Sequence, residues 1–228
     1  MNKTVIIPCY NEKQTILRII EKVKENLIEG DEIIVVDDHS DDGTTEVLSQ
    51  ISDKSIKIIY HKKNFGKGKA LNSALKEELK DIVIIQDADL EYDPSEYNLL
   101  IEPFKKTNAD VVYGSRFSSS KYTRLHFFWH YVANKILTLM CNLVTNLNMT
   151  DMETGYKLFK KNVIKSIEIK EKSFGCEPEI TIKLSKKKFI FYEVPISYAG
   201  RSYNEGKKIR IKDAFRALYC IIYYGLLR

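Results

Sequence analysis

The sequence predicts an α/β fold with a mostly parallel central sheet flanked by helices, and three observations support this prediction. Short β-branched runs alternate with segments whose apolar residues have helical spacing. The predicted strands are continuous apolar runs, which is typical of a parallel sheet covered on both faces. Polar motifs follow the strands at their carboxyl ends, where such sheets bind ligands.

The first half of the chain contains five predicted strands and three predicted helices. The strands are β-branched runs at 4–7, 32–36, 56–60, 81–85 and 111–113. The first helix, 13–24, is predicted from the spacing of Ile16, Ile19, Ile20 and Val23. The other two helices are expected at 44–51 and 68–79.

The second half has a less regular pattern. A long helix is expected at 125–147, where aromatic and aliphatic residues are frequent. A turn leading into a strand is expected at 151–159, a helix at 177–184, a strand at 189–195 and a final helix at 212–227. The 228 residues suit one domain, with 1–200 as its body and 201–228 as a basic, amphipathic C-terminal segment of that same domain.

Charge and cysteine content narrow the classes of partner. The net charge is +5, and between Lys183 and Arg228 eleven Lys or Arg residues face three acidic ones. Such a basic end suits phosphates, anionic lipid or nucleic acid. The four cysteines are far apart, which disfavours a zinc site and predicts reduced, buried thiols. The apolar run at 4–8 is too short for a signal peptide, and no run reaches the length of a membrane span.

The motif Asp87-Ala88-Asp89 directly follows a predicted strand. Residues two apart in an extended backbone point the same way, so both carboxylates can face one site. Mg2+ and Mn2+ take oxygen ligands and often bind through one or two carboxylates together with substrate phosphates. A solvated acidic turn is the alternative interpretation. Glu91 could add a ligand or orient a bound water.

Two further motifs suit a nucleotide. Asp37 and Asp38 end the second strand, where an acid commonly accepts hydrogen bonds from ribose or base, although residues here could also cap the next helix. The run 64–70, Asn-Phe-Gly-Lys-Gly-Lys-Ala, has the glycines of a phosphate loop ahead of a helix. It lacks the spacing of an ATP-binding P-loop, so an ATPase is disfavoured, and a tight turn explains the run equally well.

Taken in order, these segments resemble the family 2 glycosyltransferases with the GT-A (nucleotide-diphospho-sugar transferase) fold. The nearest resemblance is to the dolichol-phosphate mannose and glucose synthases and the undecaprenyl-phosphate glycosyltransferases. The matching segments cover nearly the whole chain and lie at 7–12, 36–44, 64–70, 87–91, 114–116, 151–157 and 201–207.

The resemblance implies a role for each matched position. A donor site for a UDP- or GDP-sugar would be formed by Pro8, Tyr10, Asn11, Glu12, Asp37, Asp38, Lys67, Asp87 and Ala88. A divalent cation, Mg2+ or Mn2+, would be held by Asp87, Asp89 and Glu91, although the relatives often have Gln at the position of Glu91. Catalysis would depend on Asp89, Arg116 and Arg201, and the acceptor phosphate would be bound by Arg124, Arg201 and Lys207.

The expected reaction is an inverting hexose transfer to a polyprenyl phosphate, dolichyl or undecaprenyl. Such an acceptor is already anionic and needs no general base, so positioning and positive charge would suffice. The main alternative is a saccharide hydroxyl acceptor in the synthesis of a cell-envelope glycan, for which Glu177 or Glu179 could act as the base. Pro178 interrupts the acidic pair of the hydroxyl-using relatives, which favours the phosphate.

Alternatives outside this class are a nucleotidyltransferase and a non-catalytic nucleotide-binding protein. A nucleotidyltransferase usually has its glycine-rich, basic loop after the first strand, where this chain has Pro8 to Glu12. No nucleic-acid partner is expected. If the basic end did bind nucleic acid, the affinity would depend strongly on salt concentration.

A membrane surface and a second copy are the remaining expected partners. The helix at 125–147 either packs in the core or lies in the headgroup plane, where Trp and Tyr are favoured. Because basic residues precede it in the sequence, the C-terminal helix could dock on anionic lipid. A cytoplasmic protein, peripheral on the inner face of the membrane, is therefore expected, and a homodimer is the alternative use of the apolar helices.

Overall fold

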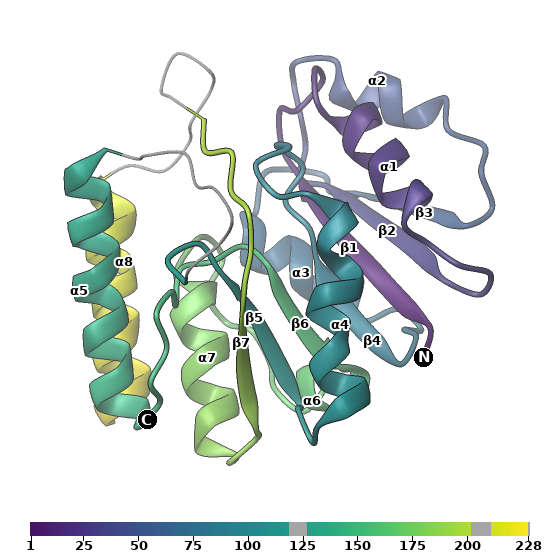
Figure 1. The fold of residues 1–228 in the computed structure, drawn as a ribbon. Coiled ribbons are helices and arrows are strands. Elements are labelled where there is room, and N and C mark those ends of the chain that lie inside the picture. Colours follow the sequence, from purple (N-terminus) through teal and green to yellow (C-terminus); the bar gives the residue numbers. More distant parts are fainter. Residues whose placement is uncertain (119–126, 202–210, 228) are drawn as a thin grey trace.

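The computed structural model describes residues 1–118, 127–201 and 211–227 and forms a three-layer α/β/α fold (Figure 1). The central sheet has seven strands in the order β3-β2-β1-β4-β6-β5-β7. The strands are β1 (Lys3–Cys9), β2 (Glu32–Asp37), β3 (Ile56–Tyr60), β4 (Ile82–Ile85), β5 (Val111–Ser115), β6 (Lys157–Lys160) and β7 (Phe191–Pro195). Only β6 pairs antiparallel with its neighbours among the described strands, so the prediction of a mostly parallel sheet is confirmed.

Helices cover both faces of this sheet, as the continuous apolar strands require. Alternate strand residues enter two separate cores: Ile6 and Val83 belong to one, and Val5 and Ile84 to the other. One face is covered by α1 (Ile16–Glu25), α2 (Thr44–Ser49) and α4 (Tyr97–Lys106). The opposite core takes residues from α3 (Lys67–Leu75), α5 (Phe128–Thr145), α6 (Lys161–Ile164), α7 (Cys176–Lys186) and α8 (Ile211–Ile222).

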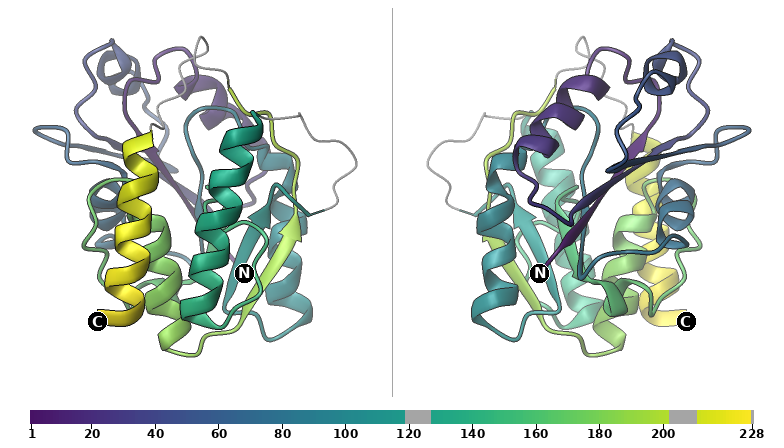
Figure 2. Two further views of the ribbon diagram at one scale, coloured as in Figure 1. Left: turned by 90° about the vertical axis from the view of Figure 1, so that its left-hand side faces the viewer. Right: turned by 90° about the vertical axis from the view of Figure 1, so that its right-hand side faces the viewer.

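Helices α5 and α8 lie side by side at the outer edge of the molecule, next to α7 (Figures 1 and 2). Helix α5 buries Leu137, Thr138 and Cys141, yet much of its remaining apolar surface is exposed. A π-helical turn, Tyr223–Leu227, continues α8 to the end of the described chain. None of the helices within the described ranges is long and apolar enough to cross a membrane. The predicted C-terminal helix is confirmed, and the four cysteines are free and buried as expected.

Several elements differ from their predicted bounds. Helix α1 begins at Ile16 rather than at residue 13, because a turn closed by the Glu12 carbonyl occupies the start of that range. Helix α3 ends at Leu75, four residues early. Helices α4 and α6 were not predicted, and α4 contains Pro103.

The sheet brings segments that are far apart in the sequence to one edge. Strands β1, β2, β4 and β5 all end there, and β6 begins there because it runs the opposite way. Three of the turns that leave these strands contain a non-glycine residue with positive φ, namely Asn11 at 51°, His39 at 64° and Leu90 at 63°. Such a backbone is strained for a side chain other than glycine and concentrates at functional sites.

Candidate active site

A cleft of about 520 Å³ opens at this edge of the sheet. It is lined by residues from both halves of the chain, namely Pro8, Cys9, Tyr10, Glu12, Asp38, Asn64, Gly66, Lys67, Ala70, Asp87, Ala88, Asp89, Glu91, Tyr92, Arg116, Glu153, Gly155, Ser173, Phe174, Glu177, Tyr198 and Arg201. The carboxyl ends of parallel strands are where open α/β sheets bind ligands, so this cleft is the candidate active site.

Arg201 joins the two halves of the cleft through three carboxylates. Its guanidinium donates to both oxygens of Glu12 at 3.1 and 3.2 Å and to Asp89 Oδ2 at 3.1 Å. Glu91 accepts from the backbone N–H of Arg201 at 2.7 Å and from the hydroxyl of Tyr198. One arginine therefore offsets part of a three-carboxylate cluster, and Glu91 uses both oxygens to hold the segment that carries Arg201.

The negative charge around Asp89 suits a cation. Burial, with the charges of Asp87 and Glu91, raises the pKa of Asp89 to about 7, although Arg201 opposes the shift. A divalent cation would relieve that repulsion, and carboxylate oxygens are its preferred ligands. Among the residues that the structure describes, no three Asp, Glu, His or Cys side chains form a group that could hold a metal. Asp87 and Asp89 fit the pattern in which two carboxylates share the ion with substrate phosphates.

Gly155 fixes the position of Asp87. A Cβ atom built on Gly155 would lie 2.1 Å from Asp87 Oδ2 and 2.8 Å from the ring of Tyr92. The Gly155 N–H also donates to the Tyr92 hydroxyl at 2.8 Å. The turn before β6 thus contacts the carboxylate directly, and only glycine leaves room for it.

Lys67 and Glu177 belong to a buried charge network at the floor of the cleft. Lys67 Nζ lies 2.8 Å from Asp87 Oδ1 and 2.9 Å from Glu177 Oε1, and Lys157 contacts the other Glu177 oxygen. Burial by itself would raise the pKa of Glu177, but Lys157 and Lys67 outweigh it and lower that pKa. Glu177 is therefore a weak base that is already paired on both oxygens.

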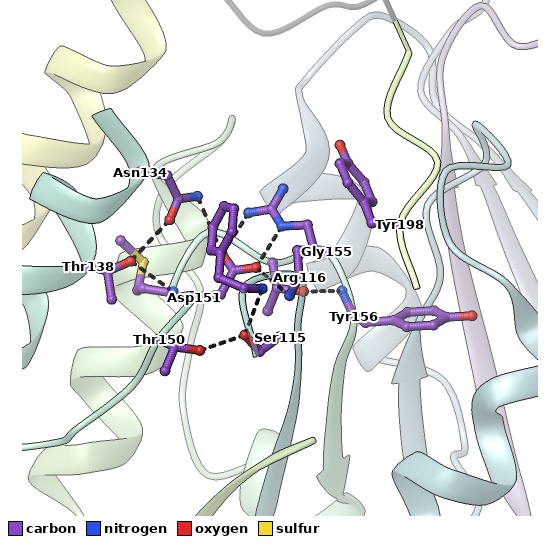
Figure 3. A network of polar contacts seen from close by, with 12 residues as sticks. Ser115, Arg116, Asn134, Thr138, Thr150, Asp151, Gly155, Tyr156 and Tyr198 are labelled. Carbon is purple, nitrogen blue, oxygen red and sulfur yellow. Dashed lines mark hydrogen bonds and ion pairs between the residues drawn. The ribbon is translucent and has the colours of Figure 1, made fainter. Parts of the chain in front are cut away.

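Arg116 is held at the cleft wall by Asp151 (Figure 3). Its Nε donates to Asp151 Oδ2 at 2.6 Å and its Nη2 to Oδ1 at 2.7 Å, while its backbone N–H donates to Oδ2 at 3.1 Å. The guanidinium also lies over the Tyr198 ring, 5.1 Å from the centroid. A bidentate pair of this kind fixes the plane of the guanidinium as well as its place.

The two acids that end β2 have different roles. Asp38 lines the cleft and accepts hydrogen bonds from the backbone N–H groups of Phe65 and Gly66. Asp37 points away from the cleft lining and accepts from Ser40 and from the Thr45 hydroxyl. Asp38 therefore shapes the glycine-containing turn before α3, whereas Asp37 organises the turn that leads to α2.

Most of the predicted site residues lie in the cleft. The exceptions among described residues are Asp37 and Asn11, whose side chain pairs with Asp41. Glu179, one of the two candidate bases, accepts from the backbone N–H groups of Lys170 and Glu171 and is absent from the lining. Arg124 and Lys207 lie outside the described residues.

The sequence interpretation did not single out Asp151, Glu153 or Tyr198. Asp151 and Glu153 were noted only within the matching segment 151–157, and nothing in their local sequence tells which one binds Arg116. Tyr198 follows β7, whose position beside β5 comes from long-range pairing. The available signal was the pair of acids Asp151 and Glu153, four and two residues before Gly155, in the turn that leads into a predicted strand.

Comparison with protein families and curated proteins gives consistent matches. Residues 4–168 match the family described as Glycosyl transferase family 2. The chain is 30% identical to a dolichol-phosphate mannosyltransferase of Pyrococcus furiosus, over 91% of this chain and 59% of that protein. It is 26% identical to a UDP-N-acetylglucosamine–dolichyl-phosphate N-acetylglucosaminyltransferase of Methanococcus voltae, over 96% of this chain and 94% of that protein.

Solved structures show the same fold. Glucosyl-3-phosphoglycerate synthase of Mycobacterium tuberculosis, in complex with Mn2+, UDP and glucosyl-3-phosphoglycerate, superposes with a TM-score of 0.74 at 18% identity. The match covers 97% of this chain and 79% of that one. A second structure of that synthase, with Mg2+ and UDP, gives a TM-score of 0.73. At this identity the likeness shows the GT-A fold.

Proposed function

The chain belongs to glycosyl transferase family 2, and from that membership we propose that it moves a hexose from a UDP- or GDP-sugar to a polyprenyl phosphate, with inversion at the anomeric carbon. The observation that carries the proposal is the meeting of the Asp87–Asp89 pair with Arg116 and Arg201 in one cleft. Two relatives whose names specify dolichyl-phosphate acceptors support the acceptor class.

Residues at the ends of different strands would bind different parts of the donor. Pro8, Tyr10 and Asp38 would contact the nucleoside, since they lie at the carboxyl ends of β1 and β2. Asp87 and Asp89 would hold Mg2+ or Mn2+ with the diphosphate; when bound, the ion would neutralise charge on the leaving group. Glu91, the third predicted ligand, would instead orient Arg201.

The reaction needs positioning more than proton transfer. An oxygen of the lipid phosphate would form a bond to the sugar C1 as the bond from C1 to the nucleoside diphosphate breaks, and the electron pair leaves with the diphosphate. Arg116 and Arg201 would place positive charge beside the two anionic groups. The hydroxyl-acceptor alternative loses both of its expected bases, because Glu177 is paired with two lysines and Glu179 does not line the cleft.

Contact with the membrane would use the outer surface of α5 and α8. Trp129, Leu139 and Leu143 on α5 and Phe215 and Tyr219 on α8 are at least half exposed. We propose that this apolar surface lies on the inner face of a membrane and brings the cleft to its lipid acceptor. A homodimer through the same surface is the competing use.

The proposal is tested by transfer of labelled sugar from a panel of UDP- and GDP-sugars to a short polyprenyl phosphate, with Mn2+ or Mg2+. Wild type and the surface control Glu102→Gln should transfer from one donor, and Asp89→Asn should not. Transfer to a saccharide but not to the lipid phosphate would refute the acceptor class. Absence of any sugar-nucleotide binding would refute the function.

A further inference from the structure

Glu153 is a carboxylate of the cleft wall whose buried Oε1 has no hydrogen-bond partner among the described residues. It lies in the turn before β6. Burial, with the charge of Glu177, raises the pKa of Glu153 to about 7, although Lys157 and Arg116 act against the shift. A buried polar atom of this kind is costly unless a ligand or water satisfies it.

The other carboxylates that line the cleft are all engaged. Each accepts a hydrogen bond or forms an ion pair within the protein, as described above for Glu12, Asp38, Asp87, Asp89, Glu91 and Glu177. For Glu153 the described residues provide no hydrogen bond and no ion pair. Within the described parts of the cleft, Glu153 is therefore the acid that is available to accept a hydrogen bond from a bound molecule.

The order of the strands places Glu153 beyond the diphosphate. The nucleoside residues lie at the carboxyl ends of β2 and β1, the acidic pair follows β4, and Glu153 leads into β6, which lies on the far side of β4 from β1. Arg116, which follows β5, stands beyond it. A sugar nucleotide laid along this edge with its diphosphate at Asp87 and Asp89 would thus bring its sugar to Glu153.

The chemistry of a carboxylate selects the group that it binds. Above the pKa of about 7, where Glu153 is ionised, its carboxylate only accepts hydrogen bonds and repels phosphate oxygens, so the acceptor phosphate is not its partner under these conditions. A sugar hydroxyl donates the hydrogen bond that Oε1 lacks. We propose that Glu153 accepts a hydrogen bond from a hydroxyl group of the transferred sugar and so helps to select the donor. This inference rests on the proposed function.

The test compares the parent sugar nucleotide, identified in the panel above, with its monodeoxy analogues. Wild type should lose roughly 10- to 100-fold in kcat/KM with one deoxy analogue, the cost of an unmade bond to a charged group. Glu153→Ala should lose a similar factor with the parent donor and little more with that analogue. Glu153→Gln, which keeps the shape, covers the case in which the alanine variant does not fold.

Two results would overturn the inference. If Glu153→Ala and Glu153→Gln lost the same factor with the parent and with every deoxy donor, the residue would act in proton transfer or in structure. If both kept wild-type donor preference, it would have no role in selection. Titration with UDP or GDP alone distinguishes failure of the proposed function from failure of the Glu153 assignment. If the wild type binds no nucleotide and no sugar nucleotide, the proposed function is refuted. If the wild type transfers sugar, but the losses from the Glu153 substitution and from the deoxy donor simply add, only the assignment of Glu153 is refuted.

Discussion

Removal of the charge on Asp151 is expected to destabilise the protein, because Asp151 is the buried partner of Arg116. The Asp151 side chain is 0% exposed and that of Arg116 11% exposed. Asp151→Asn would leave the guanidinium buried without its counter-charge while retaining one amide oxygen as an acceptor. Breaking a buried pair by removing one partner typically costs ~3–5 kcal/mol, and we expect about 3 kcal/mol here.

That loss is measurable by urea unfolding and by thermal melting. For a chain of this size 1 kcal/mol corresponds to roughly 2–4 °C, so the melting temperature should fall by about 6–12 °C. The double variant Arg116→Met/Asp151→Asn removes both charges and should recover a large part of the loss, because no unpaired charge then remains buried.

Two outcomes would refute this reasoning. Asp151→Asn within about 1 kcal/mol of wild type would mean that water or another group compensates Arg116. A double variant that loses the sum of the two single losses would show that the two side chains do not interact energetically.

Three further predictions concern the cleft and the outer surface. Because the pKa of Glu153 is raised from its usual 4.5 to about 7, folding favours its protonated form, so stability falls as pH rises from 4.5 to 7. Between pH 4.5 and 8, the free energy of unfolding measured in urea should fall by up to about 3 kcal/mol less for Glu153→Gln than for wild type. The same dependence of unfolding free energy on pH in both proteins would contradict this. Gly155→Ala should displace Asp87, cost about 1–3 kcal/mol and weaken Mn2+ binding in calorimetry; unchanged affinity would argue against Asp87 as a ligand. Leu143→Gln should reduce sedimentation with anionic vesicles by several-fold without lowering the melting temperature, whereas Leu17→Gln, an exposed leucine on α1, should not; a changed oligomeric state with unchanged sedimentation would favour the dimer.

Local sequence was sufficient to predict the strands and the motifs that follow them. Strands β1, β2 and β4 are continuous runs of apolar residues because helices bury both of their faces, and their polar ends therefore stand out. The position of β6 could not be predicted in the same way. Its antiparallel place between β4 and β5 depends on pairing over more than forty positions, which no short pattern encodes.

The site was predictable to the level of the motif, but not to the level of the single side chain. Asp37 and Asp38 are adjacent and chemically alike, yet successive residues point to opposite sides, so only Asp38 reaches the cleft. Likewise, Asp151 and Glu153 are both acids of one short segment, but Asp151 is the one that accepts a hydrogen bond from Arg116, and no local pattern distinguishes the two. Helix α4 was not predicted although its buried residues have helical spacing, because Pro103 lies within the run and proline disfavours a helix interior.

The pairing of Arg201 with Glu12 spans 189 positions, and this has a consequence for synthesis of the protein. A growing chain that has emerged only as far as β6 already carries Glu12, Asp89 and Glu91 but lacks Arg201, whose guanidinium they share. The three acids then repel one another, and the edge of β5 that β7 will cover is unpaired. Donor binding should therefore appear abruptly, when the segment after β7 docks, so that an unfinished chain on the ribosome does not bind the sugar nucleotide.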